Sequence, residues 1–217
     1  MKKRNLELIS NMLIFLLVVA AVLWIFLNQN TKALAGGGID VLKYFTVQSN
    51  ILVGGASLMS FILLLRNKYT DLYKLIKFVC VAAVTLTFVT VLVYLTPLMG
   101  FLLLVQDANS LLHIVIPVIA IIHLFLLESE FEKPNFVFTL YSVTPMFIYG
   151  IGYFINLIAR NGYGDYRYDF YAFGKFGLGF GILAFFLMIL LTYAIGVGLY
   201  FGYTKINIKP KIKTSEA

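Results

Sequence analysis

Six long apolar stretches, separated by short polar segments, dominate the pattern of hydrophobic and polar positions along the chain. A stretch of about 20 apolar residues is long enough to cross the hydrocarbon core of a bilayer as an α-helix. The predicted spans cover approximately residues 9–27, 44–65, 75–96, 111–127, 136–158 and 176–203. A further apolar stretch, residues 98–105, is too short to cross and is expected to be re-entrant or interfacial. The pattern therefore predicts an all-α, six-helix membrane bundle that forms a single domain over residues 1–217.

Composition excludes an ordinary soluble domain, because 61% of the 217 residues are hydrophobic and only 12% are charged. The net charge of +7 is carried by few residues, mostly between spans, so membrane topology explains it better than nucleic-acid binding does. The lone cysteine, Cys80, lies in an apolar run and can form no internal disulfide. No phosphate-binding loop and no metal-ligand spacing is present, so we expect neither a cofactor nor a metal.

Two interpretations of the first apolar stretch stay open. Ala33-Leu34-Ala35 follows it and resembles a signal-peptidase site, which would make this stretch a cleaved signal peptide. The apolar stretch is long for a signal peptide, and the polar segment before Ala33 is long as well. An uncleaved first span is therefore the favoured interpretation.

The distribution of Lys and Arg predicts the orientation of the six spans. An even number of spans places both termini on one side of the membrane. On that side lie Lys2, Lys3, Arg4, Arg66, Lys68, Lys74, Lys77, Lys133, Lys205, Lys209, Lys211 and Lys213. The other side has Lys32, Lys43, Arg160, Arg167 and Lys175. Since positive charge concentrates in the cytoplasm, we expect a multi-pass protein of the cell membrane with both termini cytoplasmic.

Polar residues mark the outer ends of the second and fourth spans. Thr46, Ser49 and Asn50 are spaced i, i+3, i+4 and so share one helix face, with Gln48 beside them. Thr46 lies roughly 3 Å into its span and His113 about 4 to 5 Å into the fourth, at the helical rise per residue. Polar groups at such depth usually face a bundle interior or a cavity. The second and fourth spans are therefore predicted to be neighbours.

This pairing has a catalytic and a structural interpretation. A threonine hydroxyl is a weak nucleophile until a base removes its proton, and His113 is the candidate base for Thr46. Asn50, Ser49 or backbone N–H groups would stabilise an oxyanion, near the positive ends of helix dipoles. Pro117 cannot donate to the carbonyl of His113, so the backbone there is expected to be loosened. The structural interpretation is that these polar side chains form hydrogen bonds between helices.

The sequence resembles the androgen-induced protein family, which includes the androgen-dependent regulator of tissue-factor-pathway inhibitor and many bacterial relatives. The resemblance rests on Lys43-Tyr44-Phe45-Thr46, on Gln48-Ser49-Asn50, and on Asn109-x-x-x-His113-x-x-x-Pro117. It also covers the number of spans, the order of the Thr and His spans, and an aromatic loop before the last span. In that loop this chain has Tyr168-Asp169-Phe170 where the family usually has Tyr-Pro-Phe.

The resemblance implies a membrane-embedded threonine hydrolase that acts on fatty acid esters of hydroxy fatty acids. Thr46 matches the nucleophile of the family and His113 matches its catalytic histidine. The residues expected to contact the lipid ester substrate are Gln48, Ser49, Asn50, Asn109, Arg167 and Asp169. A non-enzymatic carrier or lipid-binding membrane module is the alternative.

The remaining polar residues carry weaker expectations. The loop from residue 159 to residue 175 is expected to bind an anionic lipid group through Arg160, Arg167 and Lys175, with the apolar chain among the second, fourth and sixth spans. His123 is expected to be a packed or snorkelling histidine. No acidic residue is expected deep within a span, which argues against a proton pump.

Overall fold

The computed structural model describes residues 2–28, 38–104, 106–128, 134–165 and 167–207. Helices dominate this part of the chain, and no strand occurs in it. In chain order the elements are α1 (Lys2–Leu27), η1 (Gly38–Lys43), α2 (Phe45–Arg66), α3 (Asp71–Thr90), η2 (Val91–Leu95), α4 (Thr96–Met99), α5 (Phe101–Leu104), α6 (Ala108–Ser110), η3 (Leu111–Val115), α7 (Ile116–Ile122), η4 (His123–Leu127), α8 (Phe138–Tyr141), α9 (Thr144–Ala159) and α10 (Leu178–Asn207). The Ala33–Ala35 sequence lies outside the described residues.

Six helical stretches in the described chain are long and apolar enough to cross a membrane. They are Lys3–Leu27, Phe45–Arg66, Asp71–Leu95, Ala108–Leu127, Phe138–Ala159 and Leu178–Asn207. The predicted all-α fold is thus confirmed in the described chain, with six helices long and apolar enough to cross a membrane and boundaries a few residues from those expected. The short apolar stretch after the third span forms α4 and α5, two single helical turns that are too short to cross.

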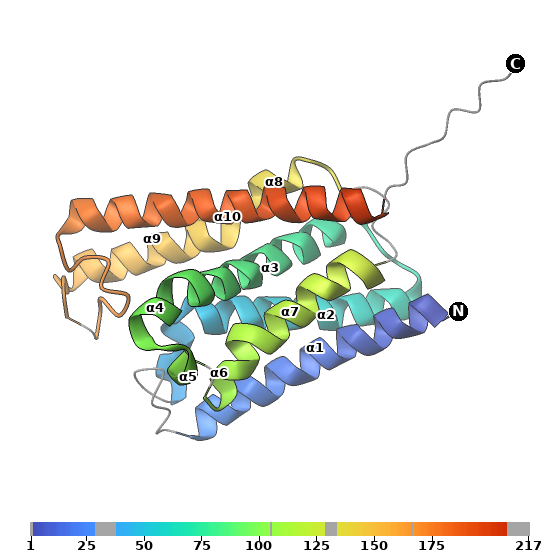
Figure 1. The fold of residues 1–217 in the computed structure, drawn as a ribbon, viewed down its shortest axis with the longest axis horizontal. Helices are drawn as coiled ribbons and strands as arrows, with labels where there is room; N and C mark the ends of the chain where they lie inside the picture. The colour runs from blue at the N-terminus through green and yellow to red at the C-terminus, as the bar shows by residue number, and fades with distance from the viewer. Residues whose placement is uncertain (1, 29–37, 105, 129–133, 166, 208–217) are drawn as a thin grey trace, which may run out of the picture.

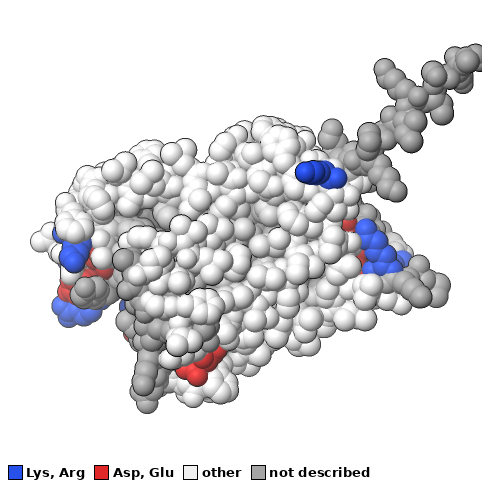
Figure 2. All heavy atoms as spheres, in the orientation of Figure 1, with Lys and Arg blue, Asp and Glu red and all other residues white. Residues whose placement is uncertain are grey.

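The described ends of the chain, Lys2 and Asn207, lie at the same end of the bundle (Figure 1). We call this the termini end. The opposite end, which we call the long-loop end, carries η1, α6 and the loop 160–177 between α9 and α10 (Figure 1). Between the two ends α1 packs along α2, α3 contacts both α2 and α10, and α9 lies beside α10. Figure 2 shows charged side chains at both ends, with an uncharged band between them on this face, as a membrane-spanning body requires.

Close packing of α1 on α2 fixes the position of the second span. Val18 of α1 and Val47 and Val53 of α2 belong to one buried apolar core. Gly54 allows the two helices to approach, since a Cβ atom at this position would lie 2.9 Å from Cγ1 of Val18. The face of α2 that carries Asn50 and Gly54 is therefore turned into the bundle.

Both histidines lie in π-helical turns. The π turn η3 contains His113 and η4 begins at His123. A proline at the start of the following helix explains η3, and also η2, because Pro117 and Pro97 lack the N–H group that would bond to the carbonyl four residues earlier. The backbone at His113 thus departs from the α-helical bonding pattern, and such π turns are frequent at functional sites.

Candidate functional site

Asn50 joins the second span to the fourth. Its Nδ2 donates to the carbonyl oxygen of Thr46 at 2.7 Å and to that of Leu112 at 3.1 Å. Asn50 is fully buried, and Leu112 directly precedes His113 in η3. The start of α2 and the His113 turn therefore meet inside the bundle, as the matching depths of Thr46 and His113 predicted.

A small polar cluster surrounds this contact. We use this name for Thr46, Ser49, Asn50, Thr87, Asn109 and His113. Ser49 Oγ lies 2.9 Å from Thr87 Oγ1 of α3 and 3.1 Å from the carbonyl oxygen of Thr46. His113 is 4% exposed and Asn109 is 2% exposed, whereas Thr46 is partly accessible. The candidate nucleophile and the candidate base therefore lie on two turns that Asn50 joins.

Two acceptor oxygens in the polar cluster have no partner. Oδ1 of Asn50 and Oδ1 of Asn109 are buried and accept no hydrogen bond from any described residue. Leaving a buried acceptor unpaired costs about 1–3 kcal/mol, so both oxygens favour a donor such as water or a ligand hydroxyl. The donors of Ser49 and Asn50, in contrast, are already used by the protein. These two side chains are therefore poorly placed for the oxyanion role that the sequence suggested.

Aromatic side chains hold the first turn of α2 in place. The hydroxyl of Tyr171, in the loop 160–177, accepts from the backbone N–H of Phe45 at 3.0 Å. Tyr149 of α9 donates to the carbonyl oxygen of Lys43 at 2.7 Å. Burial raises the pKa of Tyr171 to about 12, so this hydroxyl stays neutral at physiological pH. The loop and α9 thereby fix the backbone that carries Thr46.

Asp169 organises the loop 160–177 from within. Its carboxylate is fully buried and accepts from the backbone N–H groups of Gly164 and Gly174, each at 3.0 Å, and from the hydroxyl of Tyr153. These bonds occupy the carboxylate, so the geometry favours a structural role over the expected contact with substrate. Arg167 is exposed and pairs with Asp165, whose pKa is lowered by the hydrogen bonds from Arg167.

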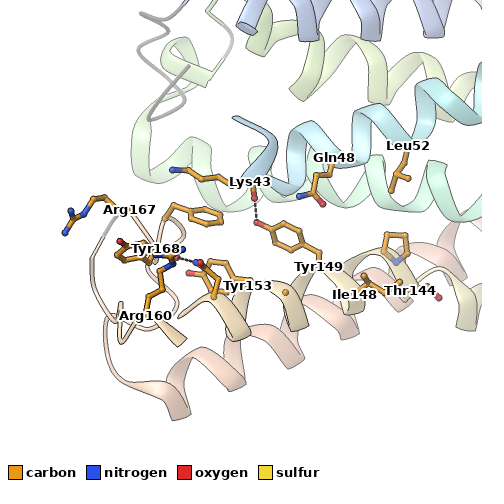
Figure 3. Close-up of a pocket in the computed structure, with 14 residues that line it drawn as sticks. Lys43, Gln48, Leu52, Thr144, Ile148, Tyr149, Tyr153, Arg160, Arg167 and Tyr168 are labelled. Atoms are coloured by element: carbon orange, nitrogen blue, oxygen red, sulfur yellow. Dashed lines mark hydrogen bonds between the residues drawn. The ribbon is translucent and has the colours of Figure 1, made fainter. Parts of the chain in front are cut away.

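A groove of about 790 Å³ runs between α2 and α9 below the loop 160–177 (Figure 3). Gln48 and Arg167 line it, whereas Thr46 does not. Thr46 is two residues before Gln48 and so lies almost on the opposite side of α2. The predicted site residues thus divide between the groove and the polar cluster. The groove also lies between the second and fifth spans rather than among the second, fourth and sixth.

A third group of polar side chains, which we call the charged network, lies at the termini end. Its members are Glu7, Ser10, Asn11, Ser57, Tyr69, Lys77, His123 and Glu128. Lys77 is fully buried and donates to Asn11 Oδ1 at 2.7 Å and to Ser57 Oγ at 3.0 Å. Lys77 is thus an interior residue and not one of the boundary charges among which the sequence placed it.

His123 connects two parts of the charged network. Its Nδ1 lies 2.7 Å from Ser10 Oγ and its Nε2 lies 3.1 Å from Oε2 of Glu128, while Tyr69 donates to Oε1 of Glu128 at 2.6 Å. Burial acts to raise the pKa of Glu128, but the hydrogen bond from His123, the charge of Lys77 and the hydroxyl of Tyr69 together lower it. Glu128 is therefore an ionised carboxylate inside the protein.

Sequence reasoning missed most of this network. Glu7 and Glu128 are buried near the ends of their spans. No acidic residue was expected deep within a span, but the enclosure of these two was not foreseen. One signal was available, because Glu7, Ser10 and Asn11 are spaced i, i+3, i+4 and so form a polar face on the first span. The burial of Lys77 depends on partners from other helices and has no local signal. Within the described chain, no three His, Cys, Asp or Glu side chains form a metal-binding group.

No family model, curated protein or solved structure matches this chain. The resemblance to the androgen-induced protein family stays a prediction.

Proposed function

We propose that the chain is a multi-pass protein of the cell membrane with both termini in the cytoplasm, and that Thr46 and His113 hydrolyse a lipid ester. In this orientation the polar cluster lies near the outer surface. The substrate reaches it from the outer leaflet, because a lipid ester is insoluble in water.

The observation that carries the proposal is the bridge that Asn50 makes between Thr46 and Leu112. It brings the turn of the candidate nucleophile against the turn of the candidate base. The unpartnered oxygens of Asn50 and Asn109 add support, because a hydrolytic water is one donor that would satisfy them. The π turn at His113 also agrees with a functional role for this backbone.

The proposed reaction follows the scheme of other hydroxyl nucleophiles. His113 takes the proton of Thr46 Oγ1, which attacks the ester carbonyl carbon. The C–O bond to the alcohol breaks, and the alcohol leaves with the proton from His113. Water then attacks the acyl-threonine with His113 again as base, which releases the fatty acid and restores Thr46. The positive end of the α2 dipole favours the oxyanion formed in each step.

Labelling of the purified protein with a fluorophosphonate lipid, together with hydrolysis of a long-chain ester, tests this proposal. Thr46→Ala should abolish labelling, and His113→Ala should lower hydrolysis by about 10²–10⁴-fold, the usual contribution of a general base. The double variant should be little worse than either single variant, because the two residues act as one unit. Thr87→Ala is the matched control, since it removes a hydroxyl of the same cluster that has no chemical role. Undiminished labelling of Thr46→Ala would refute the proposal.

A carrier of a small solute is the second candidate, and the charged network is the observation that favours it. Ser57 lies on the Asn50 face of α2, two turns toward the termini end, and bonds to Lys77. Polar groups therefore continue from the polar cluster toward His123. Ionisable residues inside membrane spans often mark the pathway of an ion or substrate.

The two candidates make opposite predictions for variants of the charged network. Lys77→Met would block transport but leave ester hydrolysis within about twofold, provided that the variant remains folded. Uptake of a solute into vesicles that is abolished by Lys77→Met and unaffected by Thr46→Ala would favour the carrier.

A further inference from the structure

The groove between α2 and α9 has the dimensions of a site for one acyl chain. Its wall on α9 extends from Thr144 to Asn156, which corresponds to about 18 Å at the helical rise of about 1.5 Å per residue. Half of the hydrocarbon core of a bilayer measures about 15 Å. The volume of about 790 Å³ lies within the range of small-molecule sites, about 300–1,000 Å³. The groove is thus long enough for a lipid chain from one leaflet.

The two ends of the groove differ in character. Leu52, Pro145 and Ile148 line the end that lies farther along α2, within the spans. Lys43, Arg160 and Arg167 line the end beneath the loop 160–177 (Figure 3). A ligand that satisfies both ends has an apolar chain and an anionic head.

The three cations are not equivalent. Arg167 donates to both carboxylate oxygens of Asp165 and is already neutralised. Lys43 and Arg160 form no ion pair with any described residue. They are held by aromatic faces instead, with Lys43 Nζ 5.3 Å from the ring centre of Phe170 and Arg160 Cζ 5.2 Å from that of Tyr168. Both rings line the groove, so the two cations are kept at its mouth.

We propose that this groove binds one long-chain fatty acid, with its carboxylate at Lys43 and Arg160 and its chain along α2 and α9. The guanidinium of Arg160 suits a carboxylate, because its parallel N–H groups match the two oxygens. This site is distinct from the polar cluster, because Gln48 faces the groove and Thr46 does not. The inference therefore does not depend on hydrolysis at Thr46.

Equilibrium binding of radiolabelled oleate and of methyl oleate to the purified full chain in lipid nanodiscs tests this site. The two probes share a chain and differ in charge. Lys43→Gln combined with Arg160→Gln should raise the dissociation constant for oleate at least tenfold and leave that for methyl oleate unchanged. Lys175→Gln is the matched control, since Lys175 does not line the groove. It should keep the affinity for oleate within about twofold.

A second pair of variants tests the position of the acyl chain. Gly152 lines the groove, and a Cβ atom added there would meet nothing within 4 Å, so Gly152→Leu places a side chain in the groove. It should weaken binding of both oleate and methyl oleate. Gly179→Leu, on α10 and equally open, should weaken neither.

Three results would overturn the assignment. They are equal binding of oleate in the wild type and in the Lys43 and Arg160 double variant, undiminished binding in Gly152→Leu, and stronger competition by a lysophosphatidate than by oleate. Either of the first two results would show that the groove does not bind the fatty acid. The third would show that the groove prefers a phosphate head group to a carboxylate. Since Thr46→Ala should still bind oleate, loss of hydrolysis alone affects the proposed function and not this inference.

Discussion

Glu128 has three neighbours that favour its charged form. His123, Lys77 and Tyr69 surround its carboxylate, and burial removes the water that would otherwise solvate it. Removal of this carboxylate is costly, because the buried donors that bond to it lose a charged acceptor, at about 1–3 kcal/mol. The folded state therefore depends on the ionisation of this residue.

The first prediction concerns the dependence of stability on pH. The pKa of Glu128 in the folded protein lies below its ordinary value of 4.5, so its charge contributes stability above about pH 4.5 that is lost as the pH falls further. The thermal midpoint of the protein in detergent should decrease as the pH is lowered from 5. Glu128→Gln should be less stable at pH 7 by about 1–3 kcal/mol and should show a weaker fall.

The exposed acid Asp71 provides the control for this prediction. It pairs with Lys74 at the surface, where an ion pair contributes about 0–1 kcal/mol. Asp71→Asn should therefore keep both the midpoint and its pH dependence. An unchanged pH profile in Glu128→Gln would mean that other groups cause the acid instability.

Among the elements, the π turn η3 determines where His113 points. A π turn contains one more residue than the α-helical turn it replaces, and one residue corresponds to about 100° of helix rotation. Pro117 maintains this turn, because it has no N–H group for the carbonyl of His113. The direction of His113 therefore depends on a proline four residues away.

We predict that Pro117→Ala lowers ester hydrolysis at least tenfold without loss of stability. The added N–H group permits a regular α-helix through residues 111–117, which rotates His113 relative to Thr46. The thermal midpoint should stay the same or rise, since proline inside a helix costs about 3 kcal/mol. Pro97→Ala is the matched control, because Pro97 follows a similar π turn, η2, outside the polar cluster. Full activity of Pro117→Ala would show that the π turn is not required for ester hydrolysis.

At this same scale the sequence predicted most of the elements. The six long apolar helices follow from hydropathy alone, and the irregular helical turn at His113 follows from the position of Pro117. The neighbouring positions of spans two and four were predictable from the depth of Thr46 and His113. The groove was not predictable, because no pattern in the residues of α2 or α9 indicates that these two helices line one groove.

At the scale of the whole molecule, burial separates residues that look alike in the sequence. Lys74 and Lys77 both precede the apolar part of the third span, yet the side chain of Lys74 is 22% exposed and Lys77 is fully enclosed. The enclosure of Lys77 requires Asn11 of α1 and Ser57 of α2 as partners. Such a network depends on the assembled bundle, so no single stretch of sequence predicts it.

The last prediction concerns the orientation of the assembled bundle. The described termini share one end, and the basic residues are more numerous at that end than at the long-loop end. Since cytoplasmic segments near membrane spans carry the excess of Lys and Arg, the termini end should be cytoplasmic. Lys77 is buried and does not contribute to this excess, but the remaining residues keep the same bias.

Single cysteines at exposed positions, labelled in intact cells with a membrane-impermeant maleimide, test this orientation. Gln106→Cys and Lys175→Cys, both at the long-loop end, should react, and Lys68→Cys and Lys205→Cys should react only after the membrane is opened. The native Cys80 is buried, so the parent protein provides an unlabelled baseline. Reaction of the second pair in intact cells would show that the orientation of the bundle is the reverse of the predicted one. The polar cluster and the mouth of the groove would then face the cytoplasm, and substrate would have to come from the inner leaflet.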